Sequence, residues 1–480
     1  MQTRPVILCV RALATACWLA LANATFAAAP EAPGANEHLA ALSAAYVRAA
    51  QPGAQADTYR ELLGVVLARA QRSFALEVDT PAFIAAALKV LEPLAPGSGE
   101  PAAVFKSAVN AALAALDPHS DYLDPREQAA RRSAITGSFG GLGMQVDMAD
   151  GLVRVVATME DTPASRAGLR GGDVIVRFNE QPVLGMSLAD AISRMRGDPG
   201  TPITLIIRRP GREEEFPVSL VRAIIRTQAL RWRMDGDVRV LRLARFTVSV
   251  AADIEKAIDA ASAVRAPRAV ILDMRGNPGG LLEQAVAAAD IFLAKGEIVS
   301  LRGRTAGNRR TWRADAAERL AGLPMVILIN GVSASAAELV AAALQENGRA
   351  IVMGQRSFGK GSVQTMMSLG ADKGMLRLTT AVYYGPSGRT VQRSGVGPDI
   401  ELLAATPAQV PRRREADRAH ALPGSDDAPA PPRARVEQAR CAPPKPLDDQ
   451  PLACALAFLR TGDIDAFVAE VAAPELAAQP

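Results

Sequence analysis

A lysine in a tight glycine loop is the residue of this chain best suited to act as a base. Nearly all the basic residues of this chain are arginine, and lysine occupies only seven positions. One of them, Lys360, stands between two glycines in the run SFGKGS at 357–362. Arginine cannot lose its proton in a protein, whereas a lysine removed from water can. Lys360 is therefore a candidate general base.

A candidate nucleophile lies upstream, at the predicted junction of a strand and a helix. Ser335 follows the apolar run 324–329 and precedes the Ala/Leu-rich run 336–344. The free N–H groups at a helix N-terminus can stabilise an oxyanion beside such a serine. A structural alternative stays open, in which Ser335 caps the helix and Glu338 completes a capping box.

A glutamine close after the lysine could orient its amine. Residues 362–369 have the pattern of a strand, so Lys360 and Gln364 should project to the same side. A lysine that takes a proton must be neutral, in an apolar site, and the neighbouring Phe358 and glycines fit this requirement. The alternative for Lys360 is an ordinary solvated loop lysine.

The same loop also fits the nucleotide-binding pattern GxxxxGK over residues 354–360. That motif continues with Ser or Thr and opens a helix. Position 361 is instead glycine, and a strand is predicted to follow. We therefore do not predict a nucleotide site.

Histidine occurs at only three positions, His38, His119 and His420. This scarcity argues against a His-based metal site, so no cofactor is predicted. It also leaves His119 as the one partner available for a Ser-His-Asp triad. The same scarcity of histidine favours Lys360 as the general base.

A glycine-rich turn (DMRGNPGG, 273–280) follows a second apolar run at 269–273. Glycines permit positive φ and close approach of the backbone, so this turn could supply an oxyanion donor; an ordinary tight turn is the alternative. Apolar runs that end in Gly- or Ser-rich turns before helices indicate βαβ units with a buried parallel sheet. This pattern covers residues 225–403.

Residues 137–220 differ from their surroundings by short alternating strands and one predicted helix at 187–195. They open with a Gly-rich loop whose successive N–H groups, at Gly141, Leu142 and Gly143, could hold a chain-terminal carboxylate. The edge of the following strand could then pair with the peptide. This segment indicates a domain that reads the C-terminal end of a peptide.

The first residues are typical of an export signal, predicted for 1–28. A short apolar region flanked by Arg4 and Arg11 leads to small residues, and it is too short to span a membrane. Cys17 fits a lipoprotein site only loosely. We therefore expect an exported, periplasmic protein, and association with the inner membrane is left open.

Two cysteines would remain after signal removal, Cys441 and Cys454, and an oxidising compartment would favour a disulfide between them over two free thiols. Composition and periodicity predict a helical N-terminal region at 35–130, a disordered Pro/Arg-rich linker at 404–447 and a helical C-terminal segment at 448–480. The net charge is only +4, so nucleic acid is not an expected partner.

Taken in order, these motifs resemble the C-terminal processing (tail-specific) serine proteases with one PDZ domain. The similar region runs from about residue 115 to residue 400. It includes LDPHSDYL at 116–123, the 137–220 module, and the runs 272–282, 330–338, 354–364 and 383–389. The resemblance implies an α/β fold, with a ClpP/crotonase-like ββα-spiral protease core, an inserted β-rich PDZ domain and a helical N-terminal region.

The resemblance also implies site residues. It implies a Ser-Lys dyad of Ser335 and Lys360, assisted by Gln364. It implies an oxyanion hole from the N–H of Ala336 and from a glycine of the NPGG turn, assigned to Gly279. Alanine at position 337, where serine is commoner in the family, does not touch this dyad.

The predicted function is that of an exported serine endopeptidase which binds free apolar C-terminal tails and cleaves through an acyl-enzyme. The expected partners are protein substrates with free C-termini, while an adaptor or activator and a homo-oligomer are left open. His119 falls in a family motif without a catalytic role. The intact dyad argues against a peptide-binding scaffold with an inactive core, and the PDZ module argues against crotonase-like acyl chemistry.

Overall fold

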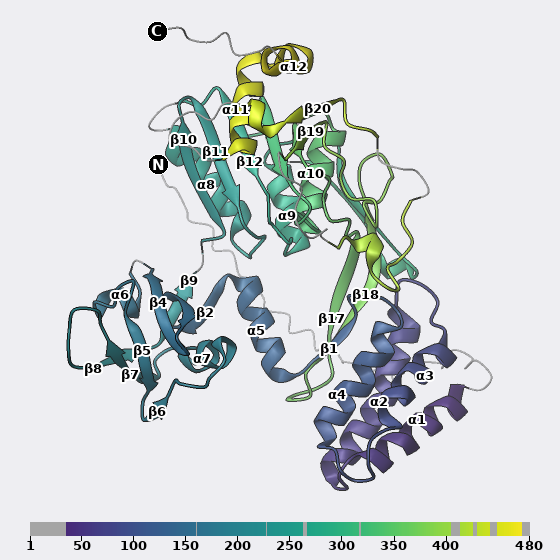
Figure 1. Cartoon of the computed structure of the whole chain (residues 1–480). Helices are drawn as coiled ribbons and strands as arrows, with labels where there is room; N and C mark the ends of the chain where they lie inside the picture. The colour runs from purple at the N-terminus through teal and green to yellow at the C-terminus, as the bar shows by residue number, and fades with distance from the viewer. Residues whose placement is uncertain are drawn as a thin grey trace, which may run out of the picture.

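The computed structural model describes residues 35–159, 161–226, 228–262, 266–315, 318–404, 413–425, 430–441 and 449–472. The signal peptide predicted for 1–28, with Cys17, lies outside these residues. Among the described residues, no helix has the length and apolar character needed to cross a membrane. Figure 1 shows three parts, namely a bundle of N-terminal helices, a small β-rich domain and a larger α/β core.

The α/β core is built on a seven-stranded sheet in the order β10-β11-β12-β15-β16-β19-β20. The first two strands are antiparallel, and the other neighbours are parallel. The strands are β10 (Leu230–Asp235), β11 (Val238–Leu243), β12 (Ala269–Asp273), β15 (Met325–Ile329), β16 (Ile351–Gly354), β19 (Ile400–Leu403) and β20 (Ala434–Glu437). Every residue of β12 and β15 is buried, which confirms the prediction of strands covered on both faces.

Two layers of helices cover this sheet (Figure 1). One face carries α8 (Val250–Ser262), α9 (Leu282–Asp290) and α10 (Ala336–Glu346), and the other carries α11 (Gln450–Thr461) and α12 (Ile464–Ala472). Side chains of β15 alternate between the layers: Ile327 packs with α10, whereas Val326 and Leu328 pack with α11. The C-terminal helices are therefore an integral layer of the core.

A second sheet joins the core to the helical bundle. Its strands are β1 (Asp121–Leu123), β18 (Met375–Tyr384), β13 (Glu297–Gly303) and β14 (Arg309–Arg313) in that spatial order, with β17 (Ser362–Ser368) also paired to β18. The bundle consists of α1 (Ala35–Ala49), α2 (Ala54–Ser73), α3 (Thr80–Leu91) and α4 (Pro101–Ala114). Leu376 and Leu378 of β18 are buried in the apolar core of the bundle, so the long β17–β18 hairpin anchors it (Figure 1).

The β-rich domain follows α5 (Pro125–Thr136) and has the strand order β3-β4-β5-β7-β8, with β6 paired to β5. Its elements are β3 (Met144–Ala149), β4 (Leu152–Thr158), α6 (Pro163–Arg166), β5 (Val174–Phe178), β6 (Gln181–Pro182), α7 (Leu188–Met195), β7 (Pro202–Arg208) and β8 (Phe216–Val221). The chain enters along β2 (Ser138–Gly141) and leaves along β9 (Ala223–Arg226), which pair with each other. The domain is thus an insertion held by a two-stranded ribbon.

Part of the segment predicted to be a disordered linker is ordered against the core. Within 404–447, the structure describes residue 404, residues 413–425 and residues 430–441. Glu415 is fully buried, Leu422 lies in the apolar core of the bundle, and β20 extends the main sheet. For these residues the prediction is wrong, because a Pro/Arg-rich composition does not reveal the few side chains that find buried partners.

Cys441 and Cys454 are bonded in the structure, with their Cα atoms 4.9 Å apart and a sequence separation of 13. The bond ties the segment after β20 to α11. We expect the double variant Cys441→Ala/Cys454→Ala to lose about 3 kcal/mol of unfolding free energy, because a closed loop of this length restricts the unfolded chain. Urea denaturation with and without a reductant measures this loss. A wild-type midpoint that does not respond to reductant would show that the thiols are free.

Candidate active site

Ser335 lies on the sharp turn between β15 and α10. Its backbone has φ 56° and ψ −116°, a conformation that costs a residue with a side chain about 1–3 kcal/mol. A strained strand-to-helix turn of this kind raises a serine hydroxyl above the edge of a sheet. Ser335 is half-buried and follows a wholly buried strand, so it has the local geometry of a nucleophile.

Lys360 lies in the glycine loop just before β17, and its amine donates to Gln364 Oε1 at 2.7 Å. Gln364 Nε2 donates to Ser362 Oγ at 3.0 Å and to Thr379 Oγ1 at 3.1 Å. These two acceptors fix the amide so that its oxygen faces the lysine. The amine of Lys360 therefore has one hydrogen-bond partner among the described side chains, Gln364, and does not bond to Ser335 Oγ in this state.

The surroundings of Lys360 favour its neutral form. Burial is the main cause that lowers the pKa of Lys360 to about 8. The guanidinium groups of Arg377 and Arg131 lower this pKa as well, while the carboxylates of Glu415 and Asp117 act in the opposite direction. Near pH 8, a substantial fraction of this lysine can accept a proton.

The motif at 116–123 supports the site from the side of the helical bundle. Asp117 Oδ1 accepts from the backbone N–H of His119 at 2.8 Å and from Thr379 Oγ1 at 2.9 Å. Thr379 Oγ1 also accepts a hydrogen bond from the side-chain amide of Gln364. The orientation of Gln364 therefore depends on the buried carboxylate of Asp117.

His119 contacts the ordered part of the predicted linker. Its Nε2 lies 2.9 Å from both carboxylate oxygens of Glu415, and Gln392 Nε2 donates to the same carboxylate at 3.1 Å. No hydrogen bond joins His119 to Ser335, although both residues are described. The described residues also contain no group of three His, Cys, Asp or Glu side chains that could hold a metal ion.

The two predicted oxyanion donors differ in whether their N–H groups already have a partner. The N–H of Ala336, at the first position of α10, has no partner among the described residues, as an oxyanion donor requires. The N–H of Gly279, by contrast, donates to Asn277 Oδ1 at 2.9 Å. The structure therefore does not support Gly279 as the second donor. The next residue, Gly280, has an N–H without a partner in the described part of the chain.

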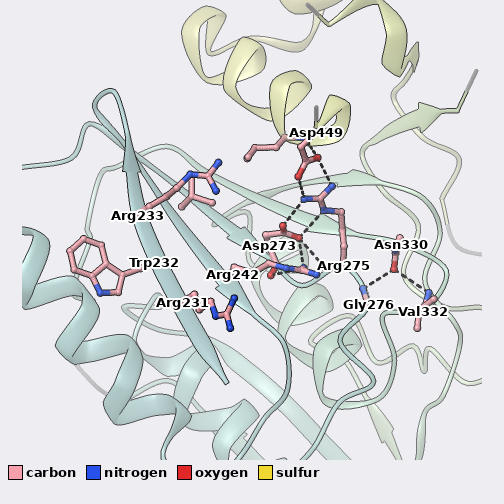
Figure 2. A pocket seen from close by; sticks show the side chains of 12 residues that line it. Arg231, Trp232, Arg233, Arg242, Asp273, Arg275, Gly276, Asn330, Val332 and Asp449 are labelled. Atoms are coloured by element: carbon pink, nitrogen blue, oxygen red, sulfur yellow. Dashed lines mark hydrogen bonds and ion pairs between the residues drawn. The ribbon is translucent and has the colours of Figure 1, made fainter. Parts of the chain in front are cut away.

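Two side chains at the ends of β12 and β15 stabilise the glycine-rich turn and the nucleophile turn (Figure 2). Asn330 Oδ1 accepts from the N–H of Gly276 at 2.9 Å and from the N–H of Val332 at 3.2 Å, so it joins the two turns. Arg275 lies between Asp273 and Asp449 and bonds to both carboxylates, which fixes α11 to the end of β12. These residues line a pocket of about 810 Å³.

The predicted carboxylate-binding loop lies at the start of the open-edged strand β3. The N–H groups of Leu142 and Gly143 donate to no group in the described part of the chain, whereas their carbonyls accept from Ala164 and Met159. Gly143 has φ 78°, and an added Cβ would lie 2.2 Å from Thr162 Cβ. Gly141, the third predicted residue, ends β2 and pairs with β9.

Two residues whose wider role the sequence did not indicate connect the nucleophile turn to the lysine loop. Tyr383 Oη lies 2.8 Å from the carbonyl oxygens of both Ser335 and Lys360, which share its one hydroxyl hydrogen. Glu338 accepts the N–H of Ser335 at 2.7 Å, as half of the expected capping box, and also the N–H of Lys360 at 2.8 Å. The only available signal for Glu338 was its spacing from Ser335, which indicated a local cap.

Two sequence-family models match parts of this chain. A sequence model of peptidase family S41 matches residues 237–402, and a PDZ-domain model matches residues 154–209. The carboxy-terminal-processing protease of Bartonella bacilliformis is 45% identical over 307 residues, which cover 63% of this chain and 70% of that protein. The carboxy-terminal processing protease CtpA of Bacillus subtilis is 32% identical over 296 residues, 62% of this chain and 63% of that protein.

One solved structure is also similar in part. The structure titled photosystem II D1 C-terminal processing protease is 25% identical and covers 73% of this chain and 93% of its own, with a TM-score of 0.43. The identity to the Bartonella protein, across more than two thirds of its length, is what assigns the family. The chain therefore belongs to peptidase family S41, as a carboxy-terminal-processing serine protease with one PDZ domain.

Proposed function

We propose that this protein is an exported endopeptidase which cleaves with Ser335 as nucleophile and Lys360 as base, after its PDZ domain has bound the free apolar C-terminus of a protein substrate. The observation that carries the proposal is the state of Lys360. Its amine is held by Gln364, and burial lowers its pKa to about 8. Its main chain shares two partners with the main chain of Ser335.

The tail would bind along β3. The free N–H groups of Leu142 and Gly143 would receive the terminal carboxylate, and the open edge of β3 would pair with the backbone of the tail. Met144 on β3 and Ile192 on α7 are partly buried apolar side chains that pack against the core of this domain. They would favour apolar residues at the end of the substrate.

Cleavage then proceeds by acyl transfer. Neutral Lys360 takes the proton of Ser335 Oγ, the oxygen attacks the scissile carbonyl carbon, and the N–H group of Ala336 stabilises the oxyanion. The C–N bond breaks as Lys360 returns the proton to the leaving amine. Water then attacks the acyl-enzyme with the same base, which releases the new C-terminus and restores Ser335.

Export to an oxidising compartment belongs to the same proposal. The apolar segment and small residues of 1–28 support it, as does the cysteine pair that closes the segment between β20 and α11. Periplasmic location would give the enzyme access to exported proteins with exposed C-termini.

The test compares one loosely folded substrate with two forms of its tail. The substrate ends in small apolar residues, and its tail is either free or amidated. We expect amidation to lower kcat/KM by roughly 10-fold or more, because charge-assisted hydrogen bonds to the carboxylate are lost. Ser335→Ala should cleave neither form. Equal cleavage of both forms by wild type would overturn tail recognition, and cleavage by Ser335→Ala would overturn the nucleophile.

A further inference from the structure

We propose that Glu338 is a positioning residue for this reaction: its buried carboxylate holds the main chains of Ser335 and Lys360 at a fixed separation, with Tyr383 fixing the same two residues from their carbonyl side. The inference rests on the proposed Ser-Lys chemistry. It assigns to the helix residue Glu338 a function that a capping box alone does not require.

The carboxylate of Glu338 gathers donors from two separate loops. Its Oε2 accepts the N–H of Ser335 at 2.7 Å and the N–H of Lys360 at 2.8 Å. Its Oε1 accepts the N–H of Gly359 at 2.6 Å and the hydroxyl of Ser357 at 2.5 Å. A single oxygen atom thus lies between the backbone nitrogens of the proposed nucleophile and base.

Only a carboxylate can satisfy this arrangement. Glu338 has no exposed surface, and a buried carboxylate is costly unless its oxygens are fully hydrogen-bonded. Burial raises the pKa of Glu338 to about 7, so its carboxylate is ionised above this pH. An ionised carboxylate is acceptor-only, with two oxygens and about four lone-pair sites, which matches the four donors. A glutamine in its place would turn an NH₂ group either toward the N–H of Gly359 or toward those of Ser335 and Lys360, so at least one of these N–H groups would lose its acceptor.

Tyr383 completes the connection from the other side. Its hydroxyl is 2.8 Å from the carbonyl oxygens of both Ser335 and Lys360. The side chain is buried, and burial raises the pKa of Tyr383, so the hydroxyl keeps its proton and remains a donor. The two backbone N–H groups are therefore bound by Glu338, and the two carbonyl oxygens share the single hydroxyl hydrogen of Tyr383.

This clamp, formed by Glu338 and Tyr383, determines where the reacting atoms stand. Ser335 adopts a left-handed φ of 56°, which persists only if its neighbours hold it. Lys360 is flanked by glycines, which leave the loop without stiffness of its own. A misplacement of about 1 Å can cost roughly 10²-fold in rate. The clamp should therefore act on kcat and leave tail binding unchanged.

The experiment measures kcat and KM separately for Glu338→Gln and Tyr383→Phe, together with the affinity of the PDZ domain for a tail peptide. Glu346→Gln is the matched control, because Glu346 ends the same helix and contacts the Ser387 loop instead of the dyad. We expect Glu338→Gln to lower kcat by about 10²-fold or more and Tyr383→Phe by roughly 10-fold, with KM and peptide affinity within about twofold. The control should match wild type.

A Glu338→Gln protein that is folded and has a kcat within threefold of wild type would overturn the proposal. If this variant does not fold, Tyr383→Phe decides, since it removes one hydroxyl from an otherwise unchanged ring; an unchanged kcat then overturns the clamp. The measurement includes Ser335→Ala and Lys360→Ala. Activity that survives these two changes refutes the Ser-Lys chemistry itself, whereas loss in these two alone refutes only the clamp.

Discussion

Lys360→Arg is expected to abolish peptide-bond cleavage while the protein stays folded and its PDZ domain still binds a tail. Arginine keeps the positive charge and much of the length of the lysine, but it cannot become neutral in a protein. It therefore cannot take the proton of Ser335. General-base catalysis typically contributes 10²–10⁴-fold, so we expect kcat/KM to fall by roughly 10³-fold or more.

The pH profile gives the same prediction an independent check. The pKa of Lys360 is lowered to about 8, so the amine is protonated and inactive well below this pH and becomes a base above it. For wild type, kcat/KM should therefore rise with pH through a midpoint near 8. Lys295→Arg, at an exposed lysine, is the control and should retain this profile. Retention of at least a tenth of the activity by Lys360→Arg would mean that another group is the base.

Gly279→Ala is expected to cause the second large loss. A Cβ at this position would lie 2.8 Å from the carbonyl oxygen of Ala334, 2.9 Å from Ser335 Cβ and 3.0 Å from the N–H nitrogen of Ala336. The added methyl would cover the free N–H of Ala336, and φ is 99° here, which alanine rarely adopts. Loss of one oxyanion donor costs about 10²–10³-fold in kcat.

Gly331→Ala is the matched control for this experiment. Gly331 lies on the nucleophile turn itself, but the nearest atom to an added Cβ is 3.9 Å away and its φ is not positive. Its kcat should stay close to that of wild type. Circular dichroism and tail-peptide binding should show that both variants are folded. A Gly279→Ala enzyme with normal kcat would place the oxyanion hole elsewhere.

The sequence alone determined the main local elements of this protein and singled out its candidate catalytic residues. The apolar runs 269–273 and 324–329 predicted strands that became β12 (Ala269–Asp273) and β15 (Met325–Ile329). Such predictions succeed because strands buried on both faces have short uninterrupted apolar runs and turns have glycines. Lys360 was found in the same way, since a lone lysine between glycines stands out against an arginine-rich background.

Only the tertiary structure decided how those residues are held. Glu338 binds the lysine loop, which lies more than twenty residues further along the chain, and Glu415 reaches His119 from a segment that composition assigned to disorder. The N–H of Gly279 donates to a side-chain acceptor two residues away, Asn277 Oδ1. Each of these contacts depends on the distance and the direction between two groups in the folded chain. Residue type and spacing do not predict these contacts, because a hydrogen bond requires that folding has brought the donor and the acceptor to the right distance and angle.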